Sequence, residues 1–175
     1  LRDGVSTLLF VGQMDFKKNP HLILRACALL RDQGEDFQLV MAGAGQDLER
    51  LKALAASLNL QDHVLFTGFV GDREEILSLY RRADLLVFPS VYDNAPMVVR
   101  EAAAVGTPSI LMRGSCAAEG VTDGVNGLLC EDTAESVCDC MRRGLSNRDA
   151  LGQAARATIP QPWRKIVADA RTRYE

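Results

Sequence analysis

Residues 84–108 read DLLVFPSVYDNAPMVVREAAAVGTP, and this stretch indicates the fold because a buried strand leads directly into a helix. The first six residues form an apolar run that is typical of a strand covered on both faces. In the helix that follows, apolar residues recur at the spacing of one helix face. These residues are Met97, Val98, Ala102 and Val105. A strand that leads into a helix is the repeating unit of a parallel α/β sheet.

Glu101 interrupts this apolar stripe, since it lies four residues after Met97 and three after Val98. A buried carboxylate without a partner is energetically costly. Glu101 therefore either accepts a hydrogen bond from a protein donor or faces a cleft where a polar ligand can reach it. Asp93 precedes Glu101 with seven residues between them, so two carboxylates flank the start of the helix.

Six short apolar runs recur along the chain, and they lack the in/out alternation of strands with one solvated face. They span residues 8–12, 37–43, 63–68, 84–89, 107–112 and 127–131. Helical patterns separate most of them. Asn19 and Pro20 have the types of a helix cap and a first helical residue, and Asp72 with Glu75 resembles a capping box.

This alternation predicts a doubly wound sheet of six parallel strands with helices on both faces and right-handed crossovers. Further helical patterns after residue 131, the last one starting near Trp163, predict a helical C-terminal tail. The chain shows no internal repeat and no linker composition. Residues 1–175 are therefore expected to form a single domain.

Composition excludes several classes of function. The net charge of −3 provides no general attraction to nucleic acid, and no apolar run is long enough to cross a bilayer. The five cysteines lack CxxC spacing, which indicates free thiols in a reducing compartment. Only two histidines are present, so a zinc site or a catalytic triad is not expected.

Ligands of doubly wound domains bind beyond the carboxyl ends of the strands, where the strand order reverses. Residues 12–18 follow the first predicted strand, Gly43-Ala44-Gly45 the second, Gly68 the third, and the Asp93 segment the fourth. Glycines let the backbone approach a ligand, and helix starts offer free amides to a phosphate. Glycines are common in such turns, however, so the GAG triplet alone is weak evidence for a nucleotide.

Taken together, the motifs are more specific than any one of them. In order they read FVGQMDFKKNPHLIL, VMAGAGQDLERL, VLFTGFVGD, ADLLVFPSVYDNAP, VVREAAAVGTP and EGVTDGVNGLL. This set resembles the C-terminal, donor-binding domain of retaining glycosyltransferases of the family-four type (glycosyl transferases group 1), which have two Rossmann-like domains in the GT-B fold. The most specific part is an acidic residue, seven residues, Glu-Ala and a Gly-x-Pro turn, here Asp93, Glu101 and residues 106–108.

The resemblance implies roles for individual residues. Glu101 would accept hydrogen bonds from the ribose hydroxyls, so that the ligand supplies its missing partner. Asp93 would orient the transferred sugar, and Lys18 would bind the leaving phosphate. Met97 and Val98 would present backbone amides to the diphosphate. Further donor contacts are implied for Asn94, Gly12, Gln13, Gly43, Gly68 and Phe69, and residues 68–71 would border the nucleobase.

Two positions depart from the family pattern. Gln13 stands where relatives commonly carry arginine, and it can donate a hydrogen bond but brings no charge. Pro96 stands where many relatives carry glycine, and it has no N–H to offer a phosphate, although proline in a first helical turn favours the helix. Relatives also mostly carry glutamate at the position of Asp93, and the shorter arm is compatible with a different donor sugar.

The function implied by the resemblance is transfer of a hexose from a nucleotide sugar, expected to be UDP-linked, to a glycan or lipid-linked acceptor with retention. No metal or other cofactor is expected. The acceptor would bind an N-terminal domain absent from residues 1–175, so this domain alone would bind donor without turning it over. The expected location is cytoplasmic, and a peripheral position at the inner membrane face stays open for a longer protein, although no membrane contact is evident in this chain.

Two alternatives remain at this stage. A nucleotide-sugar 2-epimerase would share the two-domain architecture but change the reaction, since fold alone does not determine function. A non-catalytic nucleotide-binding module that has lost part of its phosphate site would explain the presence of Gln13 and Pro96.

Overall fold

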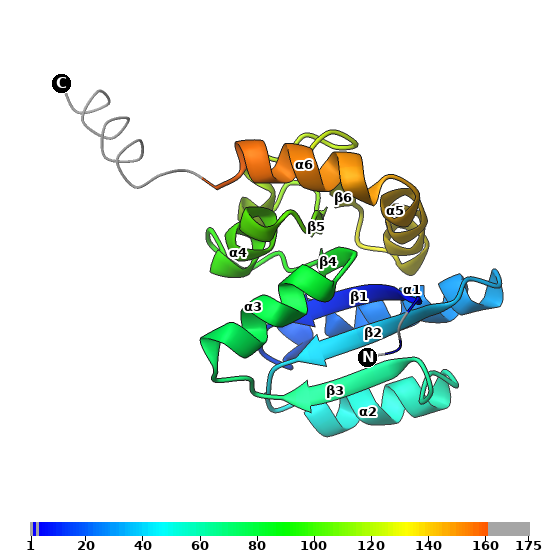
Figure 1. The fold of residues 1–175 in the computed structure, drawn as a ribbon. Helices are drawn as coiled ribbons and strands as arrows, with labels where there is room; N and C mark the ends of the chain where they lie inside the picture. The colour runs from blue at the N-terminus through cyan, green and yellow to red at the C-terminus, as the bar shows by residue number, and fades with distance from the viewer. Residues whose placement is uncertain (1, 3, 161–175) are drawn as a thin grey trace.

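A six-stranded parallel sheet forms the centre of the computed structural model, which describes residue 2 and residues 4–160 (Figure 1). In chain order the strands are β1 Ser6–Val11, β2 Phe37–Ala42, β3 Val64–Gly68, β4 Leu85–Phe88, β5 Ser109–Met112 and β6 Leu128–Cys130. They lie in the order β3-β2-β1-β4-β5-β6, and every pairing is parallel. This is the strand order of a Rossmann fold. The fold class predicted from the sequence is therefore confirmed.

Helices cover both faces of this sheet. They are α1 Pro20–Asp32, α2 Leu48–Ser57, α3 Arg73–Arg82, α4 Met97–Val105, α5 Ala134–Ser146 and α6 Arg148–Thr158. On one face α1 contacts both α2 and α5, and on the other α4 contacts both α3 and α6 (Figure 1). Helices α5 and α6 form the start of the predicted helical tail, whereas the helix predicted from Trp163 lies outside the described residues.

The inner strands carry the hydrophobic core. Every residue of β2, β4 and β5 is buried, as the lack of alternation predicts. The edge strand β3 differs, because its residues alternate between half-buried and exposed and Leu65 is 50% exposed. The chain leaves β3 through α3, which packs over β1, so one face of β3 stays uncovered. The expectation of two buried faces is wrong for this strand.

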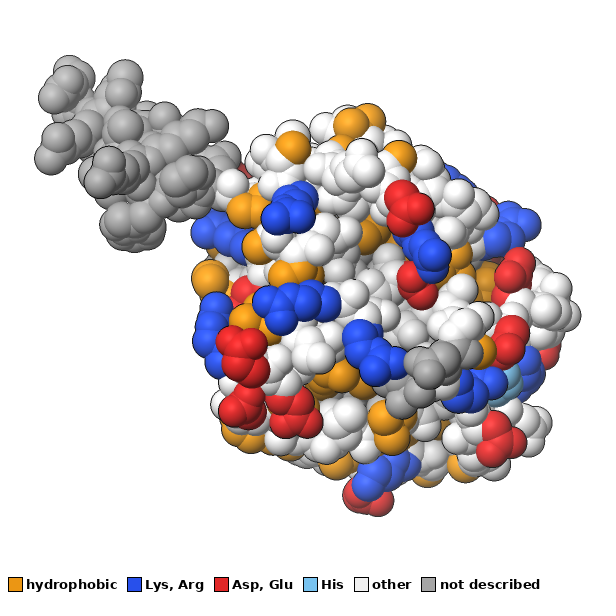
Figure 2. All heavy atoms as spheres, viewed as in Figure 1, with side chains coloured by type: hydrophobic (Ala, Val, Ile, Leu, Met, Phe, Trp, Pro, Cys, Tyr) orange, Lys and Arg blue, Asp and Glu red, His pale blue; other side chains and the backbone are white. Residues whose placement is uncertain are grey.

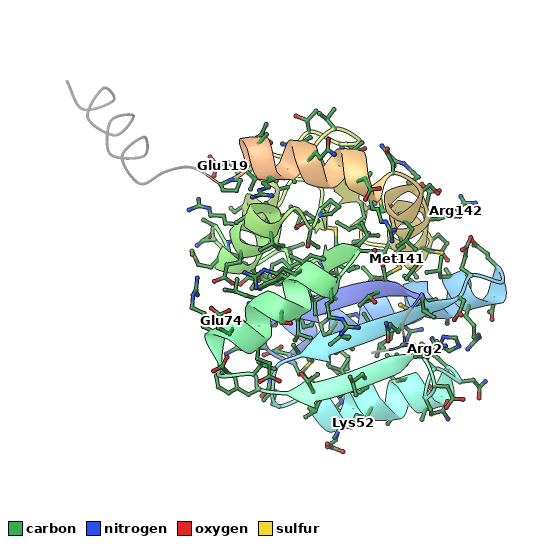
Figure 3. The ribbon with its side chains drawn as sticks, in the orientation of Figure 1. Arg2, Lys52, Glu74, Glu119, Met141 and Arg142 are labelled. Carbon is green, nitrogen blue, oxygen red and sulfur yellow. The ribbon has the colours of Figure 1, made fainter. Side chains whose placement is uncertain are left out.

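Surface helices divide their residues between this core and the solvent. In α5, Met141 is fully buried whereas its neighbour Arg142 is exposed (Figure 3). On the face that carries α3 and α6, acidic and basic side chains are interspersed (Figure 2). Among the described residues, no helix combines the length and the apolar character that a membrane span requires.

The starts of α1 and α3 differ in how they are capped. Asp72 caps α3 as predicted, since its Oδ1 accepts the N–H of Glu75 at 2.9 Å. Asn19 occupies the cap position of α1 before Pro20, but its side chain makes no capping bond. Its Nδ2 instead donates to the Pro89 carbonyl at 3.2 Å. The predicted positions of Asn19 and Pro20 at the start of α1 are therefore confirmed, but the Asn19 side chain bonds to the loop that follows β4 instead of capping its own helix.

Candidate functional site

Two loops meet at the carboxyl edge of the sheet, where the strand order reverses between β1 and β4. The loop after β1 contains η1, the 3-10 helix Phe16–Lys18, and the loop after β4 leads to α4. Lys18 Nζ forms an ion pair with Asp93 Oδ1 across the two loops. Both side chains are about four-fifths buried, with 21% and 20% of their surface exposed. The structure thus brings Lys18 and Asp93 together, as the positions of their loops predict.

The loop that carries Lys18 is held in place by carboxylates. Asp15 Oδ1 accepts the N–H of Lys17 at 2.9 Å, and buried Asp47 accepts the N–H of Phe16 at 3.0 Å. The bond from Phe16, with a further contribution from Arg50, holds the pKa of Asp47 below its ordinary value. The Arg50 guanidinium also stacks over the Phe16 ring at 4.6 Å from its centroid. Lys18 therefore projects from an ordered turn.

The glycines after β2 are explained by packing between loops. A Cβ added at Gly43 would lie 1.8 Å from the carbonyl oxygen of Gly12, and one at Gly45 would lie 2.5 Å from that of Met14. The backbones are also bonded, since Met14 donates its N–H to the Ala44 carbonyl at 3.0 Å. Gly43 and Gly45 are thus required for the close approach of two loops. Contact of Gly12 or Gly43 with a donor stays a prediction.

The first turn of α4 is open at its N-terminus. The sequence pattern places Pro96 in the first helical turn, but it occupies the cap position, one residue before that turn. No side chain caps the helix. The first amides of α4, including those of Met97 and Val98, thus have no side-chain acceptor at the cap. Ala95 adopts φ +47°, a left-handed conformation that is unfavourable for alanine. An uncapped helix start preceded by a strained residue suits an anionic ligand.

The buried face of α4 differs from the predicted stripe. Val99, Ala102 and Ala103 are buried, whereas Met97 is 61% exposed. The helix is rotated relative to the prediction, since Val99 and Ala103 replace Met97 on the side that packs against the sheet. Glu101 lies at the margin of the buried face, with 19% of its side chain exposed.

Glu101 has protein partners, which corrects the expectation that a ligand supplies its missing donor. The hydroxyl of fully buried Tyr80 donates to Glu101 Oε2 at 3.3 Å, and Arg73 Nη1 pairs with Oε1 at 3.3 Å. Burial raises the pKa of the Tyr80 hydroxyl, and the adjacent carboxylate raises it further. Arg73 is 72% exposed, so its ion pair with Glu101 is a weak surface pair. A ligand can therefore displace the guanidinium from Glu101.

Neither partner of Glu101 is predicted from the sequence. The helical pattern places Tyr80 only on the apolar face of its helix, and it gives Arg73 no role. Their contacts depend on the packing of α3 against α4, which no local motif encodes. The one available signal is the position of Arg73, which is the first residue of α3, directly after the capping residue Asp72 and two residues after Gly71.

The remaining predicted donor residues lie around this edge, most of them on loops and Gly68 at the end of β3. Gln13 and Asn94 are exposed, and the Phe69 side chain is 80% exposed. Gly68 has φ +74°, a conformation that favours glycine. Among the described side chains, none of these residues forms a hydrogen bond with Lys18 or Asp93. Their donor contacts stay predictions.

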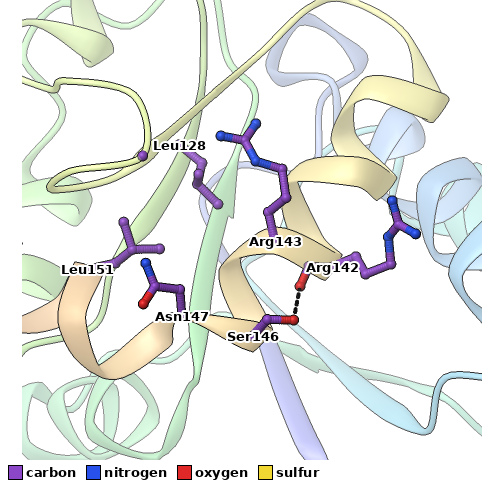
Figure 4. Close-up of a pocket in the computed structure, with 7 residues that line it drawn as sticks. Leu128, Arg142, Arg143, Ser146, Asn147 and Leu151 are labelled. Atoms are coloured by element: carbon purple, nitrogen blue, oxygen red, sulfur yellow. Dashed lines mark hydrogen bonds between the residues drawn. The ribbon is translucent and has the colours of Figure 1, made fainter.

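A cavity of about 530 Å³ lies elsewhere, between the end of α5, the start of α6 and strand β6 (Figure 4). Its lining includes Arg142 and Arg143 together with apolar Leu128 and Leu151. Arg142 is paired with Asp139 at 2.9 Å, and Arg143 lies 3.6 Å from a carboxylate oxygen of Asp123. These acidic partners compensate both guanidinium charges, so the cavity is not a strong anion site. Within residue 2 and residues 4–160, no cluster of His, Cys, Asp and Glu suitable for a metal ion occurs.

The strand order and the polar groups at its reversal define a Rossmann-like domain with its candidate site at the topological switch point. The chain belongs to the glycosyl transferases group 1, whose sequence model matches residues 1–158. A GDP-mannose-dependent phosphatidylinositol dimannoside mannosyltransferase of Mycobacterium tuberculosis is 30% identical over 168 residues, which are 96% of this chain and 39% of the relative.

Solved structures agree with this fold. The C-terminal domain of LpcC from Francisella tularensis, a group 1 glycosyl transferase, superposes with a TM-score of 0.79 at 22% identity, covering 87% of this chain and 83% of that one. Anabaena HepE in complex with UDP-glucose gives a TM-score of 0.76 at 20% identity, covering 88% of this chain and 43% of that one. The chain spans between 25% and 39% of the length of the first curated relatives.

Proposed function

We propose that this chain is the donor-binding domain of a glycosyltransferase that transfers a hexose from a nucleotide sugar to a glycan or lipid-linked acceptor with retention. Membership of the glycosyl transferases group 1 supports the reaction class. The observation that carries the site assignment is the arrangement around α4. Lys18 and Asp93 lie before its open N-terminus, and Glu101 lies one turn into the helix.

In the proposed mechanism, catalysis depends on stabilising the diphosphate as it leaves. Lys18 supplies a positive charge from the β1 side, and the uncapped amides at the start of α4 supply hydrogen-bond donors from the β4 side. Asp93 orients the hexose through its hydroxyls rather than acting as a nucleophile. These groups neutralise the leaving charge without a metal, so we expect no metal requirement. Glu101 exchanges Arg73 for the ribose hydroxyls when the nucleotide binds.

Two nucleotides are candidates for the donor. The complex of HepE with UDP-glucose supports uridine, whereas the name of the mycobacterial relative supports guanosine and mannose. We favour UDP, and both donors belong in the first binding experiment. Because curated relatives are much longer than this chain, we also propose that the acceptor binds a second domain and that residues 1–175 alone do not turn donor over.

Isothermal titration calorimetry with UDP, UDP-glucose and GDP-mannose tests the proposal. We expect one donor to bind, and we expect Glu101→Ala to lower its affinity by about 10-fold or more, the effect of losing a hydrogen bond to a charged group. Glu101→Gln serves as a companion because its amide oxygen can still accept from Tyr80. Glu35→Ala, at the opposite edge of the sheet, is the matched control. Unchanged affinity in both Glu101 variants would remove the ribose assignment.

A further inference from the structure

The Lys18–Asp93 ion pair links two loops of the proposed donor site. The two groups it joins are the ones that would bind neighbouring parts of the donor, namely the diphosphate and the hexose. In this structure they bind each other instead. Lys18 belongs to the loop after β1 and Asp93 to the loop after β4. The pair therefore connects the two loops at the point where the strand order of the sheet reverses.

Asp93 has little access to other donors. Its second carboxylate oxygen, Oδ2, is buried and has no hydrogen-bond partner within the described part of the chain. Only a fifth of the Asp93 side chain is exposed, so water cannot replace Lys18 as fully as it would at the surface. Asn19, the residue after Lys18, directs its amide to Pro89 and Asp132 rather than to Asp93.

A diphosphate that enters the site competes for Lys18. If the ammonium turns to the phosphates, Asp93 is left as a buried anion without a partner, and it also repels the new anion beside it. A hexose attached to the diphosphate changes this balance, because its hydroxyls can donate to both oxygens of Asp93. The intact donor thus satisfies both members of the pair, whereas a free nucleoside diphosphate satisfies only Lys18.

We propose that the Lys18–Asp93 pair makes nucleotide binding depend on the attached hexose, an inference that rests on the proposed function. The site selects the intact donor over the free diphosphate. After the hexose has been transferred, Asp93 loses its hydroxyl partners and recovers Lys18, which weakens the hold on the diphosphate and favours its release.

Calorimetry on wild type and Asp93→Asn with the matched pairs UDP and UDP-glucose, and GDP and GDP-mannose, tests this inference. In wild type we expect the sugar-bearing nucleotide of the recognised pair to bind at least about 10-fold more tightly than the free diphosphate. In Asp93→Asn we expect the free diphosphate to bind about 10-fold more tightly than in wild type, because the competing anion has gone. The affinity for the free diphosphate is decisive, since loss of a hexose contact alone would leave it unchanged.

Asp132→Asn is the matched control, because it removes a negative charge beside Asn19 that does not pair with Lys18. Its free-diphosphate affinity should change much less than that of Asp93→Asn. Thermal unfolding verifies that each variant is folded, and Asp93→Ser replaces Asp93→Asn if the amide is not tolerated. Equal diphosphate affinity in wild type and the Asp93 variants would overturn the inference and leave the proposed function standing. Absence of binding by all four nucleotides to wild type would overturn both.

Discussion

At the residue scale, the partial burial of Glu101 could be predicted from the sequence, but its partners could not. Its place inside an apolar helical stripe correctly marks it as a partly buried carboxylate that needs a partner. The identity of that partner could not be predicted, because Tyr80 and Arg73 belong to α3 and reach Glu101 only through helix packing. The helical period gives the spacing of a face, but it does not decide which of two neighbouring faces packs inward.

The bond between Tyr80 and Glu101 is expected to stabilise the fold modestly. Tyr80→Phe keeps the buried ring and removes the hydroxyl that donates to Oε2 at 3.3 Å. We expect the free energy of unfolding to fall by about 1 kcal/mol, measured by urea denaturation. Tyr92→Phe, at a ring that is 75% exposed, is the control and should leave stability unchanged. If the two variants are equally stable, the long bond to Glu101 contributes nothing.

At the element scale, the strands and most helix starts could be predicted because their signals are local. Long apolar runs mark the inner strands, and Asp72 marks the start of α3. The exposed face of β3 could not be predicted, since it depends on where α3 crosses the sheet. The same holds for Asn19, whose side chain bonds to a loop 70 residues away rather than to its own helix.

The approach of the loops after β1 and β2 predicts that Gly43 is intolerant of any side chain. In Gly43→Ala the new Cβ would lie 1.8 Å from the Gly12 carbonyl oxygen, a backbone atom that cannot move without displacing the loop. We expect a loss of about 3 kcal/mol or more in unfolding free energy.

Gly34→Ala is the matched control for this substitution. Both glycines have a positive φ, of +146° at Gly43 and +86° at Gly34, but no atom lies within 4 Å of the position that a Cβ would take at Gly34. The conformational cost alone should be about 1–2 kcal/mol. Equal losses for the two variants in urea denaturation would show that the loop contact is unimportant.

At the scale of the whole molecule, buried thiols link stability to pH. Burial raises the pKa of Cys130 to about 12 and of Cys140 to about 11, and it also raises the pKa values of Cys27 and Cys138. A thiol in the unfolded chain has a pKa of about 8.5, while the folded protein keeps its buried thiols protonated at that pH. The unfolded state therefore binds fewer protons at alkaline pH, and stability is lost as the pH rises above about 9.

We expect this loss to reach about 1.4 kcal/mol per pH unit for each buried thiol, measured by urea denaturation between pH 7 and 10 under reducing conditions. Cys130→Ala should lower the overall stability but make its decline with pH shallower. Cys116→Ser, at an exposed cysteine, should leave the decline as steep as in wild type. Identical slopes for all three proteins would contradict the assignment of this pH dependence to buried thiols.

A crystal structure of the chain with UDP-glucose or GDP-mannose would show whether a nucleotide sugar binds at the switch point between β1 and β4. We expect the diphosphate beside Lys18 and the first amides of α4, a ribose hydroxyl bonded to Glu101, and Asp93 turned from Lys18 to the hexose. A nucleotide bound in the cavity of Arg142 and Arg143, or at the sheet edge without contact to Lys18 or Glu101, would contradict this expectation.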